Sequence, residues 1–262
     1  MITFQRLGHH GLLGNQMFQY ATLFSVAKTN NFEYGVPYSN TGDIQFKNFF
    51  LPNCFSNLTA QDSNNSNINF IFLECSFEYN PEIFSISDNT DISGYFQTEK
   101  YFKQYRSNLL KEFTFSDLYA AKANDIRQQI PDEVISFHIR LGDYTHLEDR
   151  HPVCSYEYYN KAFDLLPNGK PILVFSDDLI LAQNLLSAFD KQFIFSDSNC
   201  KYTDMCLMSL CDYHIIANSS FSWWGSWLSN SKKTIAPAVW FGNNPSMPKN
   251  WNDIYCENWS II

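Results

Sequence analysis

The sequence predicts an α/β protein in which helices cover both faces of a parallel β-sheet. In the second half of the chain, short apolar segments alternate with segments of helical amphipathic periodicity. The apolar segments are nearly continuous, which is typical of strands buried on both faces of a parallel sheet. A hydrophobic content of 45% in 262 residues is enough for a sizeable core, and 17% charged residues is typical of a folded globular chain.

The first half of the chain, residues 1–130, is less regular. A short alternating strand is followed by a glycine-punctuated loop and a helix with recurring apolar residues. Residues 36–70 are irregular and dense in Asn, Ser, Phe and Pro, and two strands and a helix rich in aromatic residues come after them. The predicted strands cover 2–7, 67–77 and 91–96, and the predicted helices cover 17–27 and 97–113.

Residues 131–262 alternate strictly between strand and helix after a turn at Pro131. This turn predicts a boundary between a first domain of residues 1–130 and a second of residues 131–262. The predicted strands of the second domain are 134–141, 171–177, 192–198, 213–218 and 233–240, and its predicted helices are 155–166, 179–189, 202–211 and 221–229.

Four successive strands of the second domain end on small or charged polar residues. In an open parallel sheet, ligands bind beyond the carboxyl ends of the strands, so these ends predict a site. Capping of the following helix explains Ser, Asp and Asn, but Arg is not a capping residue. The four ends are Arg140-Leu141-Gly142-Asp143, Ser176-Asp177-Asp178, Ser196-Asp197-Ser198 and Asn218-Ser219-Ser220.

The residue types at these ends suit a nucleotide diphosphate. The guanidinium of Arg140 and the free backbone N–H groups at a helix start both bind phosphate oxygens. Gly142 permits a ligand to approach the backbone closely, and Asp177 or Asp178 would accept hydrogen bonds from a base or a ribose. Neither G-x-G-x-x-G nor G-x-x-x-x-G-K-[ST] occurs in the sequence, so the dinucleotide fingerprint and the P-loop are both absent.

The composition limits the classes of binding partner and the cellular compartment that we expect for this protein. A net charge of −9 argues against a nucleic-acid partner and against an anionic membrane surface. The first residues do not read as a secretory signal, and no apolar run is long enough for a membrane span. Seven cysteines without a C-x-x-C pair indicate reduced thiols. We therefore expect a cytoplasmic protein, with room for a homodimer or for a peripheral contact at the inner face of the membrane.

Several motifs occur in this chain in the same order as in the α-1,2-fucosyltransferases, and the chain therefore resembles this family, glycosyltransferase family 11. From about residue 6 to 230 the chain carries "GLLGNQMFQYA", "GYFQTEKYF", "HIRLGDY", "SDD" and "ANSSFSWWGSWLS". The resemblance implies a GT-B architecture, with two Rossmann-like lobes facing a cleft. It also implies inverting transfer of L-fucose from GDP-β-L-fucose to the 2-hydroxyl of a terminal galactose on a cell-surface glycan. No metal and no cofactor are expected.

The same resemblance assigns roles to individual residues. Residues 131–262 would bind GDP-fucose and residues 1–130 would form the acceptor side. Arg140 would clamp the pyrophosphate and neutralise the departing GDP, and Asp143 or Glu148 is the candidate general base. The residues expected to bind the donor are Asn15, His138, Arg140, Asp177, Asp178, Ser219, Ser220 and Phe221.

The sequence departs from the family pattern in two places. The family usually has a second arginine where this chain has Leu141, so any auxiliary contact of that arginine is lost. The N-terminal loop "GHHGLLGNQ" is longer than the usual form, and His9 and His10 would reshape the acceptor side.

Several alternatives remain at this stage. Asp143 serves equally well to orient Arg140, while Glu148 and His146 also fit solvated loop residues. The tryptophans of 221–229 fit core packing better than sugar stacking. A fucosyltransferase of other linkage or acceptor, a catalytically idle GDP-sugar-binding protein and a metal-dependent enzyme using Asp177 and Asp178 are the competing functions.

Overall fold

The chain forms two compact α/β units. The computed structural model describes residues 1–9, 11–38, 49–64, 66–130 and 133–262. The first unit contains Met1–Ser116 together with Asn250–Cys256, and the second contains Asp117–Lys249 together with Glu257–Ile262. The expected division at residues 130 and 131 lies beside residues 131–132, which are outside the described ones. The assignment of acceptor and donor roles to the two halves stays a prediction.

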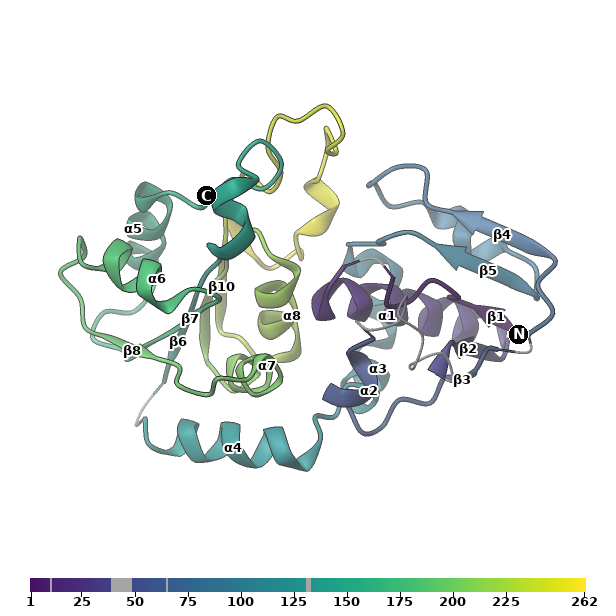
Figure 1. Cartoon of the computed structure of the whole chain (residues 1–262), viewed down its shortest axis with the longest axis horizontal. Helices are drawn as coiled ribbons and strands as arrows, with labels where there is room; N and C mark the ends of the chain where they lie inside the picture. Colours follow the sequence, from purple (N-terminus) through teal and green to yellow (C-terminus); the bar gives the residue numbers. More distant parts are fainter. Residues whose placement is uncertain (10, 39–48, 65, 131–132) are drawn as a thin grey trace. The chain divides into compact units, whose positions relative to one another are not determined.

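The second unit is built on a six-stranded parallel sheet (Figure 1). Its strand order is β11-β10-β9-β6-β7-β8. Numbered within the unit, this is the order 3-2-1-4-5-6 of a Rossmann sheet read in reverse. The strands are β6 (Ile135–Ile139), β7 (Ile172–Ser176), β8 (Phe193–Phe195), β9 (Tyr213–Ile215), β10 (Lys233–Ala236) and β11 (Ser260–Ile261).

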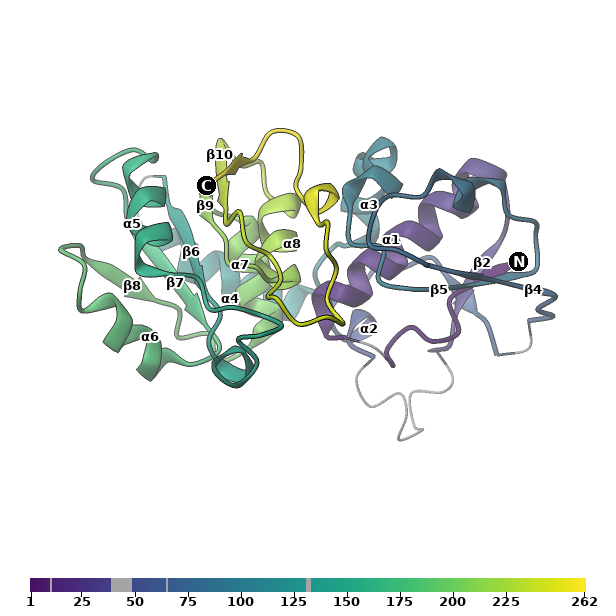
Figure 2. The same ribbon diagram turned by 90° about the horizontal axis from the view of Figure 1, so that it is seen from above.

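Helices cover both faces of this sheet, as the alternation of elements predicted. Helices α5 and α6 lie on one face, and α7 and α8 lie on the other (Figure 2). Helix α4 packs against α7, through the paired rings of Tyr119 and Tyr202 among other contacts. The helices are α4 (Asp117–Gln128), α5 (Tyr156–Asp164), α6 (Leu179–Leu186), α7 (Lys201–Ser209) and α8 (Ser220–Leu228).

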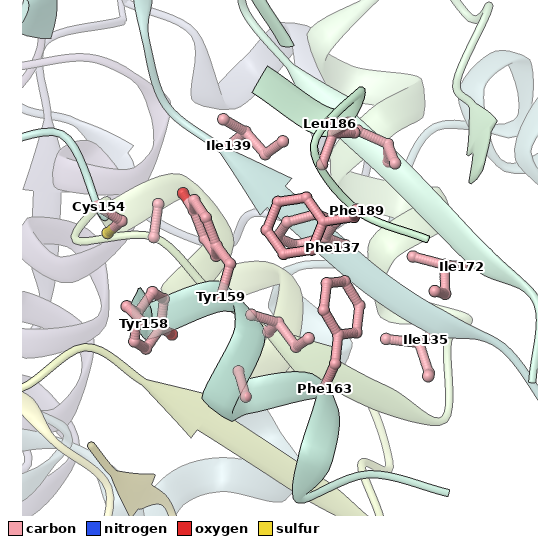
Figure 3. Packing of buried hydrophobic residues seen from close by; sticks show 14 of the residues in the cluster. Ile135, Phe137, Ile139, Cys154, Tyr158, Tyr159, Phe163, Ile172, Leu186 and Phe189 are labelled. Atoms are coloured by element: carbon pink, nitrogen blue, oxygen red, sulfur yellow. The ribbon is translucent and has the colours of Figure 1, made fainter. Parts of the chain in front are cut away.

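The alternation of side chains along β6 separates the core from the site. Ile135, Phe137 and Ile139 point into a hydrophobic cluster with α5 and α6 (Figure 3). Within it the ring of Phe137 meets Tyr159 and Phe163 edge to face, with centroids 4.8 and 5.0 Å apart. Because successive side chains of a strand face opposite ways, the intervening His138 points to the α8 face.

The first unit has a five-stranded parallel sheet in the order β3-β2-β1-β5-β4. The long helix α1 (Leu13–Asn30) is buried along most of its length. The strands are β1 (Ile2–Thr3), β2 (Tyr34–Val36), β3 (Gln61–Asp62), β4 (Phe70–Leu73) and β5 (Thr90–Ser93), and the other α-helices are α2 (Leu51–Cys54) and α3 (Arg106–Glu112).

The prediction of a single helix over 97–113 is wrong for residues 97–105. Two short 3₁₀ helices, Glu99–Tyr101 and Lys103–Tyr105, precede α3. Phe102 separates them with φ −143° and ψ 0°, values that an α-helix does not permit. Tyr101 and Phe102 are both fully buried, and this break lets two consecutive aromatic side chains reach the core.

The tryptophans of α8 pack in the interior, in agreement with the structural interpretation. Trp223 and Trp224 are fully buried and Trp227 is 4% exposed. None of the described helices combines the length and the apolar character needed to cross a bilayer.

Candidate functional site

The polar strand ends of the second unit meet where its strand order changes direction. The chain runs outward from β6 to β7 and β8, and then returns to build β9, β10 and β11 on the other side of β6. In such sheets the crevice between the two diverging strands is where ligands bind. Arg140 directly follows β6, and Asn218, Ser219 and Ser220 follow β9. Because the strands are parallel, these ends lie at one edge of the sheet, and the ligand site expected there stays a prediction.

Two carboxylates hold the side chain of Arg140. Its Nη2 donates to Oδ1 of Asp143 at 2.6 Å, and its Nη1 lies 3.0 Å from Oδ2 of Asp177. The Arg140 side chain is 20% exposed, against 56% for Asp143 and 25% for Asp177. Two of the guanidinium's five N–H donors are therefore engaged, which leaves the others for a ligand.

Asp177 also fixes the backbone of the strand end. Its Oδ1 accepts the N–H of Leu141 at 2.9 Å. A Cβ on Gly142 would lie only 2.2 Å from Asp177 Oδ2, so the glycine makes room for this carboxylate. Leu141 stands where the family usually has a second arginine, and its side chain is 5% exposed in the hydrophobic cluster.

An aromatic ring supports the guanidinium from the following turn. Residues Gly142–His146 form a 3₁₀ helix, and the guanidinium carbon of Arg140 lies 5.2 Å from the ring centroid of Tyr144. The Tyr144 hydroxyl donates to the carbonyl of Asn218, which joins the ends of β6 and β9. On its other side Tyr144 stacks on His151 at 4.8 Å.

Asn218 is a buried anchor of the same edge. Its Nδ2 donates to the carbonyls of Pro152 and Trp240 at 2.9 and 3.1 Å. This amide ties the loop after β6 to the segment after β10, and so fixes the two sides of the crevice.

His138 is neutral at physiological pH. It is 4% exposed, and its Nδ1 lies 2.8 Å from the hydroxyl of Ser222 on α8. Burial, together with the smaller effect of the nearby positive charge of Arg140, lowers the His138 pKa to about 3. The imidazole therefore takes part as an uncharged hydrogen-bonding group.

The start of α8 faces the same crevice. Ser219 is the N-cap residue, and its hydroxyl accepts the N–H of Phe221 at 3.3 Å. The remaining N–H groups of the first turn, beginning with Ser220, carry the positive end of the helix dipole. Phe221 lies with its ring 5.9 Å from that of His138.

Other predicted site residues have structural roles at their strand ends. Asp178 caps α6 by accepting the N–H of Leu181 at 3.0 Å. Ser196 and Ser198 both donate to Oδ1 of Asp204 in α7, at 2.5 and 2.7 Å. The serines at the end of β8 are therefore used for hydrogen bonds to α7, although none of them is the N-cap residue of that helix.

The candidate bases differ in how they are held. Asp143 is fixed by its ion pair with Arg140, whereas Glu148 and His146 have exposed side chains in the same loop. The backbone of that loop is fastened to the segment after β10, because Gly242 donates to the carbonyl of Arg150 at 2.8 Å. Within the described residues, no group of three or more His, Cys, Asp or Glu side chains is arranged to hold a metal ion.

Asn15 belongs to the first unit, in the first turn of α1. Its Oδ1 accepts a hydrogen bond from Gln97 Nε2 at 2.6 Å, and Gln19 of the same helix donates to the carbonyl of Gly94. The segments that carry Asn15 and Gln97 follow β1 and β5, which are neighbours at the point where this sheet changes direction. His10 lies outside the described residues, so the expectation that the lengthened loop reshapes the acceptor side stays a prediction.

Sequence reasoning did not find the residues that hold the predicted site residues in place. Asp177 was expected to contact a base or ribose, and its carboxylate here binds Arg140 and Leu141. Tyr144, Asn218, Ser222 and Gln97 lie within the quoted motifs, but no residue pattern in the sequence shows which partner each one contacts.

The sequence profile of glycosyl transferase family 11 matches residues 4–262, nearly the whole chain. An Escherichia coli alpha-1,2-colitosyltransferase is 31% identical over 88% of this chain and 90% of its own length. The O-antigen biosynthesis glycosyltransferase WbnK of Escherichia coli is 36% identical over 58% of this chain, and the match spans 56% of WbnK. A galactoside alpha-(1,2)-fucosyltransferase 2 of Rattus norvegicus is 24% identical over 84% of this chain and 65% of that protein.

Solved structures of fucosyltransferases share the fold. The fucosyltransferase NodZ from Bradyrhizobium superposes with a TM-score of 0.57 at 13% identity, over 87% of this chain and 93% of NodZ. POFUT1 in complex with GDP gives a TM-score of 0.53 at 12% identity, over 90% of this chain and 96% of POFUT1. At such identities the likeness concerns the fold alone.

Proposed function

The chain belongs to glycosyl transferase family 11 and is a glycosyltransferase with an α/β fold of GT-B type, and on this premise we propose that it transfers L-fucose. The donor is GDP-β-L-fucose and the acceptor is the 2-hydroxyl of a terminal galactose on a glycan. The product is an α-1,2-linked fucoside, formed with inversion at the anomeric carbon.

The observation that carries the proposal is the position of Arg140. Its guanidinium is held by two carboxylates at the switch point of a Rossmann sheet, beside the N-terminus of α8. The arginine and the N–H group of Ser220 at the start of α8 supply positive charge for a pyrophosphate. Asn15 from the first unit is the further donor contact that the family resemblance implies.

The reaction is a direct displacement. The acceptor oxygen forms a bond to the anomeric carbon while the bond from that carbon to the β-phosphate oxygen breaks, and GDP leaves with the bonding electrons. Arg140 stabilises the negative charge that develops on the phosphate. The proton of the acceptor hydroxyl passes to a carboxylate.

Asp143 is the candidate base because its pairing with Arg140 is exchangeable. A bound pyrophosphate competes with the exposed carboxylate of Asp143 for Nη2, while the less exposed Asp177 keeps Nη1 oriented. The exchange places a free carboxylate next to the leaving group. Glu148 is the alternative base, at the end of the same loop.

A second candidate donor sugar is colitose. The alpha-1,2-colitosyltransferase is 31% identical over 88% of this chain, a broader match than that to WbnK. Colitose is fucose without its 3-hydroxyl, so a site that hydrogen-bonds this hydroxyl would reject colitose strongly, whereas a merely apolar surround would discriminate weakly.

The test is transfer to lactose from GDP-fucose and from GDP-colitose in parallel, with EDTA present and the product linkage read by NMR. An α-1,2-fucoside formed at the higher kcat/KM supports the proposal. A higher kcat/KM with GDP-colitose would make the enzyme a colitosyltransferase. GDP release without a glycoside product would show that the acceptor is not a galactoside, and the absence of any turnover and of GDP binding would overturn the proposal.

The natural setting that we propose is the assembly of a bacterial surface glycan in the cytoplasm. The name of WbnK supports a role in O-antigen biosynthesis, and all seven cysteines are free thiols. The resulting partners are the nucleotide sugar and a galactose-terminated glycan.

A further inference from the structure

The first unit contains a pocket of about 250 Å³ at the carboxyl ends of β4 and β5. Four aromatic side chains form much of its wall: Phe72, Tyr79, Phe96 and Tyr101. The rings of Tyr79 and Tyr101 lie 4.9 Å apart, and those of Phe96 and Tyr101 lie 5.4 Å apart. Phe96 and Tyr101 are fully buried in this wall, so the aromatic side chains that remain partly accessible are those of Phe72 and Tyr79. They lie at the sheet edge where open α/β sheets bind ligands.

Glu74 is the principal polar group of the pocket. Its two carboxylate oxygens accept the backbone N–H groups of Tyr95 and Phe96, at 2.6 and 2.9 Å. Desolvation raises the pKa of Glu74, while the two N–H groups counter that rise. A carboxylate oxygen has two acceptor positions, so Glu74 retains capacity for hydroxyl donors from a ligand.

The turn that Glu74 holds has an unusual backbone. Phe96 has φ +52°, a left-handed value that a bulky residue rarely adopts, and its side chain is fully buried. The neighbouring Gly94 has φ +159° and lies so close to Glu74 that a Cβ there would be 2.4 Å from the glutamate Cβ. Strain of this kind persists where surrounding contacts enforce it, and it concentrates at functional sites.

We propose that this pocket binds one hexose ring of the acceptor glycan, an inference that rests on the proposed function and specifies where its acceptor is held. Aromatic rings pack against the C–H faces of a pyranose, and a fixed carboxylate accepts hydrogen bonds from its hydroxyls. The described lining contains Glu74 and Glu78 but neither Lys nor Arg, so it disfavours phosphate and a second nucleotide. A volume below the roughly 300 Å³ of drug-sized pockets suits a single sugar ring.

The pocket is directly connected to Asn15. Phe96 lies in the pocket wall, and the next residue, Gln97, donates to the side chain of Asn15. One strained turn thus bears a wall of the acceptor pocket and the partner of the asparagine expected to contact the donor. This arrangement places recognition of both substrates on neighbouring residues of the first unit.

Cys75 provides a direct probe of the pocket. It lines the pocket and is exposed, whereas Cys200 of the second unit is half-buried and the other five cysteines are buried. The rate of alkylation by iodoacetamide is measured at each cysteine by peptide mass spectrometry, without ligand and with lactose, a panel of other glycosides, or GDP. We expect a bound glycoside to slow Cys75 alkylation at least threefold and to leave Cys200 unchanged.

A matched pair of variants tests the same pocket by kinetics. Tyr79→Ala removes an aromatic wall and should raise the KM for the acceptor about tenfold, with little change in the rate of GDP-fucose hydrolysis. Tyr119→Ala is the control, because Tyr119 and Tyr202 form a pair at the same 4.9 Å separation in the second unit. That variant should leave the acceptor KM unchanged.

The outcomes separate this inference from the proposed function. Transfer to lactose without protection of Cys75 by any glycoside, or with equal effects of the two tyrosine variants, would overturn the pocket and leave the proposed function standing. Protection by GDP alone would also overturn it. If lactose is not an acceptor, protection by another glycoside of the panel would still support a saccharide pocket.

Discussion

Gly142→Ala should destabilise the second unit through a single side chain, Asp177. A Cβ at position 142 would lie 2.2 Å from Asp177 Oδ2, and ordinary contact begins at 3.4 Å, so the carboxylate must retreat by about 1.2 Å. That movement takes it out of hydrogen-bonding range of the Leu141 N–H, now at 2.9 Å, and away from Arg140 Nη1, now at 3.0 Å.

The size of the effect follows from the two interactions that are lost. A hydrogen bond to a charged group contributes about 1.5–3 kcal/mol, and a partly exposed ion pair contributes about 0.5 kcal/mol. We therefore expect a loss of roughly 2–3.5 kcal/mol. For a unit of this size the melting temperature should fall by roughly 4–14 °C, measured by differential scanning calorimetry.

A double-mutant cycle identifies the cause. In an Asp177→Ala background the new methyl group has no carboxylate to displace, so Gly142→Ala should cost less than about 0.5 kcal/mol there. Gly169→Ala is the control, because Gly169 has no atom within 4 Å of its Cβ position and its strain at φ +75° is the same in both backgrounds. Equal costs of Gly142→Ala in the two backgrounds would refute the reasoning.

Three further predictions concern the chemistry and the pH dependence. Arg140→Ala should lower kcat/KM for the donor on the order of 100-fold, about 3 kcal/mol in the transition state; steady-state kinetics within threefold of the parent would contradict its role. Burial lowers the pKa of His138 to about 3 and that of His214 to about 4, so below pH 6.5 the unfolded chain binds more protons. Unfolding free energy should then fall as the pH drops from 6.5 towards 4, by about 1.4 kcal/mol per pH unit for each histidine, and His138→Gln should show a shallower slope in urea titrations. Transfer should proceed at the same rate in EDTA, since Arg140 supplies the charge at the leaving group, and activity restored only by a divalent cation would contradict this.

The part of the fold that sequence predicted best is the sheet of the second unit. Its central strands β6 and β7 are buried on both faces, so their apolar runs are continuous and easily recognised. The parallel arrangement then places every carboxyl end at one edge, and this is why the meeting of Arg140 with the residues after β9 was predictable without knowledge of any distance.

The short strands escaped prediction because two or three residues show no periodicity. β3 falls in the stretch 36–70 that was predicted to be irregular, β2 ends where that stretch begins, and β11 consists of Ser260–Ile261 alone. These strands owe their position to pairing with a neighbour distant in sequence rather than to their own composition.

Side-chain partners within the site were also beyond prediction. Whether Asp177 turns towards a ligand or towards Arg140 depends on the separation of the ends of β6 and β7 in space. The role of Gly142 differs from the predicted one for the same reason. We expected the glycine to make room for a ligand, whereas in this structure it makes room for the carboxylate of Asp177.

The division of the C-terminal residues between the two units has a consequence for synthesis on the ribosome. Asn250–Cys256 belong to the first unit, where Asp253 pairs with Lys100 and accepts the N–H of Tyr79, and Glu257–Ile262 supply the last strand of the second. The first unit therefore lacks part of its structure until residues 250–256 have been translated. Both units should reach their native stability only after these residues have been translated, and a stop codon shortly before residue 250 should damage both.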